Sequence, residues 1–163
     1  MVFLGALASV FLASMVGTPQ QCENASIVGG WRLISASSTG ADGGRSETPF
    51  GISPTGMLIY TPGGHMVAII SYSGRPPLTG DRVAAPPSER AQAFATSFAY
   101  SGRYTFLCDR VVHHVEVSTV PNWVGTDMTR TVKIIGDRLI LGTPPIMRGG
   151  ASSTFELVWK RTD

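Results

Sequence analysis

The sequence predicts an all-β domain: eight antiparallel strands closed into a barrel, with one α-helix packed against it. Short runs of alternating apolar and polar residues recur along the 163-residue chain, separated by turns rich in its 19 glycines and 11 prolines. Alternation places successive side chains on opposite faces of a strand, and a chain of this length can bury one core. Closing the sheet removes exposed strand edges. A sandwich of two sheets fits the same pattern and remains an alternative.

The first strands lie before an irregular loop. In the segment 27–39, Trp31, Leu33 and Ser35 share one face of the predicted strand. The apolar runs 56–61 and 66–72 follow, and Pro62-Gly63-Gly64 between them is typical of a tight hairpin. The proline-rich segment 75–87 predicts a long loop.

One helix is predicted over 88–100. Ser88 is a suitable N-cap, and Gly102 follows the last helical residue. Helical spacing places five apolar residues in one stripe, which we expect to pack on the sheet or close one end of the barrel: Ala91, Phe94, Ala95, Phe98 and Ala99.

The remaining strands carry two ionisable groups on apolar faces. Alternation predicts five strands, over 103–108, 110–119, 127–135, 138–143 and 154–161. His113 shares a face with Val111, Val115 and Val117 in the second of these strands. Arg130 shares a face with Met128, Val132 and Ile134 in the third.

His113 and Arg130 are the candidate catalytic or ligand-contacting residues. An isolated buried charge is costly, so Arg130 must find either a protein partner or an anionic ligand oxygen. A histidine in an apolar face is either a satisfied core residue or a general acid–base group. We expect the pocket wall to consist of residues on the apolar faces of their strands and of one tryptophan in a turn: Trp31, Leu33, Val115, Trp123, Leu139, Leu141 and Phe155. Such a pocket suits an apolar molecule with one oxygen-rich end.

Several classes of chemistry lack support in the sequence. His114 faces away from His113, and His65 is distant, so no metal site is predicted. There is no phosphate-binding glycine loop, serine elbow or pair of catalytic carboxylates, so we expect no cofactor. A net charge of +2 without a basic run predicts no nucleic-acid partner.

The N-terminus predicts export. Val2–Gly17 is apolar but shorter than the about twenty residues that span a bilayer, which favours a signal peptide over 1–21. The domain proper then covers 27–163 in a secreted, lumenal or periplasmic protein without stable membrane insertion of the mature chain. A retained anchor or an apolar N-terminal helix on the domain are the alternatives.

Export would permit two modifications near that end. Cys22 and Cys108 can pair in an oxidising compartment, whereas a lone buried thiol at Cys108 is the alternative. Asn24 begins a glycosylation sequon, which has meaning in a secreted eukaryotic protein.

The chain resembles a known family in several ordered segments. They are GGWRLIS at 29–35, PFGISPTGMLIYTPGGHM at 49–66, AFATSFAYSGRY at 93–104, HHVEVSTVPNWVGT at 113–126, GDRLILGTPP at 136–145 and LVWKR at 157–161. Together they resemble the bacterial and fungal lipocalin-like domain proteins from Val28 to Thr162. The resemblance implies a small barrel with a pocket, and a basic residue, here Arg161, packed across Trp31 at the base.

The resemblance also shapes the functional expectation. Members of the family occur near natural-product biosynthesis genes, which implies a polyketide- or terpenoid-like ligand. We therefore expect a barrel that binds a small apolar molecule. The alternative is a cofactor-independent isomerase, cyclase or dehydratase that acts in the same cavity. A secreted interaction module that uses the proline-rich loop is a third hypothesis. The sequence does not identify the ligand or the oligomeric state.

Overall fold

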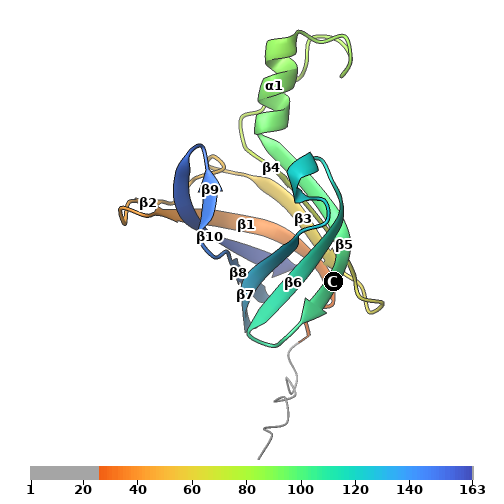
Figure 1. The fold of residues 1–163 in the computed structure, drawn as a ribbon, viewed down its shortest axis with the longest axis vertical. Helices are drawn as coiled ribbons and strands as arrows, with labels where there is room; N and C mark the ends of the chain where they lie inside the picture. Colours follow the sequence, from red (N-terminus) through yellow and green to blue (C-terminus); the bar gives the residue numbers. More distant parts are fainter. Residues whose placement is uncertain (1–25, 163) are drawn as a thin grey trace, which may run out of the picture.

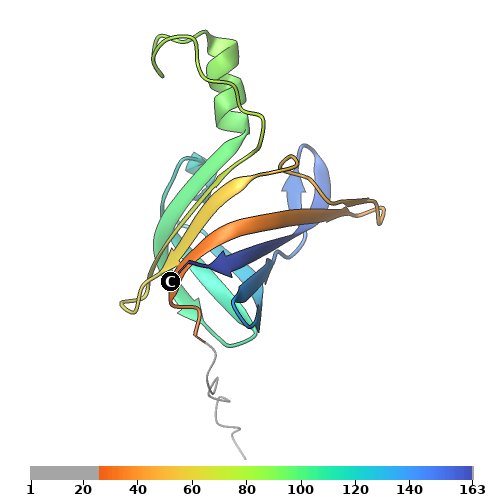
Figure 2. The ribbon, with the colours of Figure 1, turned by 180° about the vertical axis from the view of Figure 1, so that it is seen from behind.

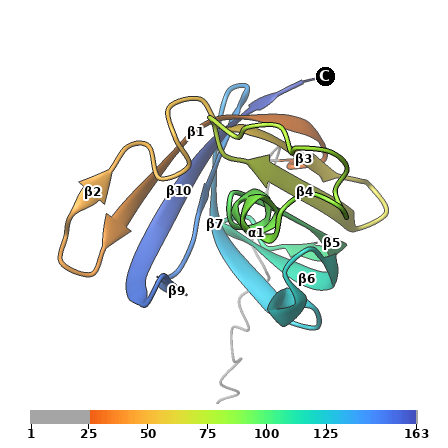
Figure 3. The same ribbon diagram turned by 90° about the horizontal axis from the view of Figure 1, so that it is seen from above.

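A computed structural model describes residues 26–162 (Figure 1). The described chain forms one antiparallel sheet in the order β2-β1-β3-β4-β5-β6-β7-β8-β10-β9, and β1 also pairs with β10. That last pairing closes eight of the strands into a barrel, which Figure 3 shows from above. The elements are β1 Gly29–Gly40, β2 Arg45–Ser46, β3 Thr55–Tyr60, β4 His65–Ser71, α1 Pro87–Ala95, β5 Ser97–Phe106, β6 Arg110–Ser118, the 3-10 turn η1 Pro121–Trp123, β7 Asp127–Ile135, β8 Arg138–Gly142, β9 Ile146–Arg148 and β10 Ala151–Arg161.

The predicted barrel is therefore confirmed, and the sandwich alternative is wrong. The closing ladder is long, from Trp31 opposite Arg161 to Gly40 opposite Ser153. The two short strands, β2 and β9, were not predicted. They pair only with the ends of β1 and β10 and lengthen one side of the wall, as Figure 2 shows for the arm that ends in β2.

The helix is present, but the predicted N-cap at Ser88 and the predicted C-terminal boundary are both wrong, because Pro86 is the N-cap residue and Ser88 lies within the helix. α1 begins at Pro87, whose fixed φ suits the first helical turn, and ends at Ala95. From Ser97 onward the chain is strand β5, where Phe98 lies opposite Ile70 and Tyr100 opposite Ala68. Phe98 and Tyr100 also alternate with small residues, so the segment satisfies a strand period as well as a helical one. Ladder bonds on both sides of β5 decide between the two patterns.

The predicted apolar stripe is consequently divided between two elements. α1 contains no buried residue, and Phe94 remains 56% exposed. The helix stands at one end of the barrel (Figure 1), where the loop before it holds it in place. Arg75 donates hydrogen bonds to the carbonyl oxygen of Ala93 and the hydroxyl of Thr96, and Glu89 accepts bonds from the backbone and hydroxyl of Thr79.

Two β-bulges change which residues face the interior. The ladder between β1 and β10 shifts between Leu33 and Ser35, so Ser35 is exposed and Ala36 is buried. The ladder between β5 and β6 shifts beside Gly102, and Val117 is 65% exposed. The predicted inward facing of Ser35 and Val117 is therefore wrong, because a bulge adds one residue to one strand and reverses the parity beyond it.

The base of the barrel is closed around Trp31. The guanidinium carbon of Arg161 lies 4.1 Å from the centre of the Trp31 ring, so the contact implied by the resemblance is confirmed. The indole N–H of Trp31 donates to the carbonyl oxygen of Ile27 at 2.8 Å. Arg161 also donates to the carbonyl oxygens of Val28 and Ser26. The first described residues are thereby fixed beneath the barrel.

The N-terminal predictions lie outside the described residues. They comprise the signal peptide over 1–21, the Asn24 sequon and the Cys22 half of the Cys22–Cys108 pair, and they remain predictions. Within 26–162, no helix is long and apolar enough to cross a membrane.

Candidate ligand-binding site

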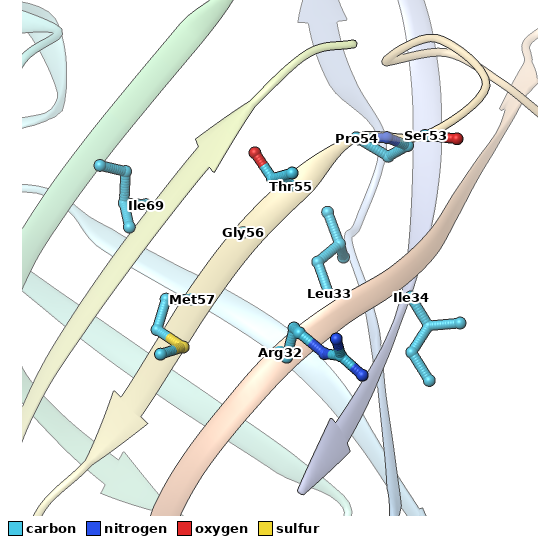
Figure 4. Close-up of a pocket in the computed structure, with 9 residues that line it drawn as sticks. All are labelled: Arg32, Leu33, Ile34, Ser53, Pro54, Thr55, Gly56, Met57 and Ile69. Carbon is cyan, nitrogen blue, oxygen red and sulfur yellow. The ribbon is translucent and has the colours of Figure 1, made fainter. Parts of the chain in front are cut away.

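Two hollows of the barrel are large enough for a small molecule, and they differ in kind. The outer one, of about 680 Å³, lies where β1 and β3 separate beyond the pair Arg32 and Met57 (Figure 4). Much of its wall consists of exposed, outward-facing side chains, including Ile34, Met57 and Ile69. Neither His113 nor Arg130 lines it. The outer groove therefore offers apolar surface without a buried polar group to orient a ligand.

The second hollow is inside the barrel and has a volume of about 450 Å³. This size is within the range of small-molecule sites. Its mouth is bordered by Phe94 and Ala95 of α1 and by Ile146 and Met147 of β9. Most of its wall is apolar, and the aromatic members are Phe50, Tyr72, Phe94, Phe98, Tyr100, Trp123, Phe155 and Trp159.

The aromatic side chains form one connected wall. The Phe50 ring stacks against Tyr72 and Phe155, with ring centres 4.7 Å and 5.7 Å apart. The Trp123 ring meets Phe98 and Tyr100 edge to face. Such flat, rigid surfaces favour the burial of an aromatic or polycyclic body.

His113 lies at the polar end of this cavity, between two tyrosines. It is 1% exposed, its Nε2 lies 2.6 Å from the hydroxyl of Tyr60, and its Nδ1 lies 3.0 Å from the hydroxyl of Tyr100. A neutral imidazole can form hydrogen bonds with both hydroxyls, because one ring nitrogen donates a hydrogen bond and the other accepts one. The three side chains come from β3, β5 and β6 and link these strands across the interior.

Burial keeps this cluster uncharged. It lowers the pKa of His113 to about 3, and the positive charge of Arg130 acts in the same direction. Burial also raises the pKa of both Tyr60 and Tyr100, although Arg130 partly opposes that shift. At neutral pH the cluster is therefore a set of neutral dipoles beside one cation.

Arg130 supplies that cation from β7. It lies opposite Val111 in the ladder, on the same inward face, and it lines the cavity. Its guanidinium donates to the carbonyl oxygen of Thr129 and contacts the sulfur of Met128. In the described part of the chain, no carboxylate forms an ion pair with it. The guanidinium is therefore available to a ligand oxygen.

The β-bulge between β5 and β6 depends on glycine at position 102. A Cβ atom at this position would lie 1.9 Å from the carbonyl oxygen of His114. Glycine thus permits the close approach of β5 and β6 at the bulge. The bulge lies between Tyr100 and His113 in the sheet, and the two side chains still meet across it.

The structure separates the predicted wall residues into three groups. Trp123, Leu141 and Phe155 line the cavity together with His113 and Arg130. Leu33 borders the outer groove. The others are buried in the core without lining either hollow: Trp31, Val115 and Leu139. What each residue does to a ligand remains a prediction.

Sequence reasoning missed part of the site. The sequence indicated that Tyr60, Tyr72, Tyr100 or Tyr104 could supply a hydroxyl to the polar end of the pocket. No local motif distinguished Tyr60 and Tyr100 among them, because their convergence on His113 depends on barrel closure. Phe50, which is 5% exposed, lies in the irregular segment between β2 and β3. The same segment holds a second large apolar residue, Ile52, which is 88% exposed, so no local signal distinguished Phe50 as the buried one. His114 does not line the cavity; its Nδ1 lies 2.7 Å from a carboxylate oxygen of Asp127, which does line it. Among residues 26–162, no cluster of metal-ligating side chains is present.

A closed antiparallel barrel, a Trp–Arg contact at its base and an internal apolar cavity define a ligand-binding barrel of the lipocalin type. The chain belongs to the lipocalin-like domain family, whose model matches residues 28–162.

One relative has an assigned role. The chain is 35% identical over 106 residues to the 4'-hydroxy-3'-methoxypropiophenone carrier protein ppsC of Aspergillus oryzae, a match that covers 59% of this chain and 96% of the relative. No solved structure matches significantly.

Proposed function

We propose that this protein binds a small apolar molecule with an oxygenated end inside the barrel and acts as its carrier in natural-product metabolism. The observation that supports this most directly is the cavity of about 450 Å³, whose apolar wall meets a neutral His–Tyr cluster and Arg130, a cation without a carboxylate partner among the described residues. The relative's name, that of a carrier for an aryl ketone, supports the same class of role.

In this proposal the aromatic wall and the polar end of the cavity contact different parts of the ligand. The aromatic wall removes the ligand body from water, which supplies most of the affinity. The Arg130 guanidinium attracts a phenolic, enolic or carboxylic oxygen, and such a bond gains strength where water is excluded. The hydroxyls of Tyr60 and Tyr100 hold His113 in place and keep the polar end ordered.

The second candidate is a cofactor-independent isomerase, cyclase or dehydratase in the same cavity. One observation favours it, namely the Arg130 charge near the Tyr100 hydroxyl, which partly offsets the rise in the pKa of that hydroxyl caused by burial. The state of His113 disfavours it. Both ring nitrogens already have tyrosine partners, and a pKa of about 3 makes the imidazole a weak base. The geometry therefore supports a carrier better than a catalyst.

The test is to identify and return the ligand. Native mass spectrometry of protein from the producing organism is expected to show a bound small molecule. Calorimetry with 4'-hydroxy-3'-methoxypropiophenone provides a defined probe. Arg130→Met is expected to weaken binding of that probe roughly tenfold or more, as removal of a buried charge-assisted hydrogen bond does. Lys133→Met, an outward-facing change on the same strand, is the matched control.

The same samples distinguish the two candidates. Recovery of the probe or the natural ligand unchanged after long incubation supports a carrier. Conversion that is lost in Arg130→Met but kept in Lys133→Met supports the enzyme. A protein that binds neither the co-purified molecule nor the probe would contradict both.

We also propose that the chain is exported. This rests on the apolar run Val2–Gly17. N-terminal sequencing of protein from its native host is expected to begin near residue 22, and an intact Met1 would contradict it. Intact-mass measurement before and after reduction tests the Cys22–Cys108 bridge on the same sample.

A further inference from the structure

The cavity contains a second polar feature, which the proposed function does not use. Trp159 of β10 is 2% exposed and lines the cavity, and its indole Nε1 has no hydrogen-bond partner among the described residues. Among the described residues, it is the one fully buried side-chain nitrogen or oxygen atom that has no hydrogen-bond partner. Folded proteins rarely leave such a donor unpaired, because its lost hydration is not replaced.

Trp159 lies deeper in the barrel than Arg130. Trp159 of β10 pairs with Leu139 of β8, and Leu139 in turn pairs with Ile134 of β7. Ile134 lies four positions after Arg130 on β7. At about 3.3 Å per residue, the two donors are attached roughly 13 Å apart along the wall. The β7–β8 hairpin marks the base, where the backbone N–H of Arg161 bonds to Asp137. Trp159 is thus nearer the base and Arg130 nearer the mouth.

A water molecule is a poor partner for this N–H. A buried water needs two to four polar neighbours. The ladder partners of Trp159 are Leu33 and Leu139, and the next inward residue on β10 is Leu157. These side chains offer no hydrogen-bonding atom. An acceptor carried by the ligand meets the requirement with a single atom.

We propose that the indole N–H of Trp159 donates a hydrogen bond to an uncharged acceptor oxygen at the inner end of the ligand. This rests on the proposed function and adds a ligand class to it: a flat apolar body with a carbonyl or ether oxygen at one end and an acidic hydroxyl at the other. The acidic hydroxyl meets Arg130. The inner oxygen is uncharged because the indole is a neutral donor, and the nearby cation Arg161 is bonded to backbone carbonyls below the cavity.

The test combines a pair of probes with a pair of variants. The probes are 4'-hydroxy-3'-methoxypropiophenone and its analogue in which two hydrogens replace the ketone oxygen. Wild type is expected to bind the ketone about tenfold or more tightly than the analogue. In Trp159→Phe, which keeps an aromatic ring and removes the N–H, this preference disappears. Trp123→Phe removes an indole from the same cavity and is expected to keep the preference.

The outcomes distinguish a failure of the Trp159 assignment from a failure of the proposed carrier function. Equal binding of both probes by wild type, or an unchanged preference in Trp159→Phe, overturns the assignment of Trp159 and leaves the carrier function standing. Binding of neither probe contradicts the carrier function for this ligand class and the assignment with it. Nuclear magnetic resonance of the wild type gives an independent reading, because the Trp159 indole proton is expected to move downfield with the ketone only. That reading does not depend on whether Trp159→Phe folds.

Discussion

Two buried tryptophans of this barrel differ in how their indole N–H groups are satisfied. Trp31 is 0% exposed and Trp159 is 2% exposed, and both belong to the same hydrophobic core. The Trp31 N–H bonds to the Ile27 carbonyl, and Arg161 covers the ring. The Trp159 N–H has no partner in the described chain. The base is therefore completed by the protein itself, whereas we propose that a ligand supplies the partner of the Trp159 N–H.

The same contrast applies to the two arginines. Arg161 donates to two backbone carbonyls in addition to its ring contact, so its charge is well solvated by the protein. Arg130 faces the cavity, where its neighbours are one carbonyl oxygen, a sulfur atom and the Tyr100 hydroxyl. Substitutions at the base should mainly change stability, and substitutions in the cavity should mainly change binding. The predictions below test that division.

The largest effect is expected at Trp31. Trp31→Ala removes a fully buried ring and exposes Arg161, so the free energy of unfolding should fall by about 3–5 kcal/mol. Urea denaturation measures the change, and Trp123→Ala, at a half-buried position, should cost clearly less. Equal losses in the two variants would contradict the assignment of the base as the stability centre.

Acid should weaken the folded protein through His113. The unfolded imidazole takes up a proton near pH 6.5, whereas the folded one resists it until about pH 3. A lowered folded-state pKa means that the stability is present above pH 6.5 and is lost as pH falls through that window. The loss approaches about 1.4 kcal/mol per pH unit from this group alone.

The variant that isolates this effect is His113→Gln. Whatever its stability at neutral pH, it should show a shallower fall in the free energy of unfolding between pH 6 and 4 than wild type. His114→Gln is the control, because that imidazole is on the outer face. If His113→Gln keeps the full acid slope, another group must be responsible.

The fold was accessible from sequence because its signals are local and repeated. Alternation in β7, β8 and β10 is regular, and the structure preserves it at Leu139, Leu141 and Phe155. The resemblance carried by the segment 29–35 and by LVWKR at 157–161 implied the Arg161 contact with Trp31 at the base. Facing was wrong only beyond the two bulges, where one extra residue reverses the parity.

The site was less accessible because its parts meet through closure rather than sequence. Tyr60 is 53 positions from His113, and no spacing rule connects them. The helix boundary failed for a related reason. Phe94 and Phe98 fit a helical stripe, but pairing with β4 and β6 places Phe98 in a strand. Both failures reflect tertiary contacts that override a local pattern.

A smaller loss of stability is expected at Arg161. Arg161→Met keeps much of the packing over Trp31 but removes the cation–π contact and the two carbonyl bonds, so about 1–2 kcal/mol should be lost. Lys160→Met, its neighbour on the outer face, removes only an exposed ion pair with Asp137. A change in Arg161→Met no larger than in Lys160→Met would show that the ring contact adds little.

The smallest change in stability is expected at Arg130, the residue with the largest expected effect on binding. Its guanidinium is half-buried and has no carboxylate partner among residues 26–162, so the charge is of little benefit to the fold. Arg130→Met fills similar volume without that charge, and the free energy of unfolding should change by less than about 1 kcal/mol in either direction. Urea denaturation of Arg130→Met beside Lys133→Met measures this. A loss comparable to that of Arg161→Met would mean that Arg130 belongs to the structural framework, and the division between base and cavity would then not hold.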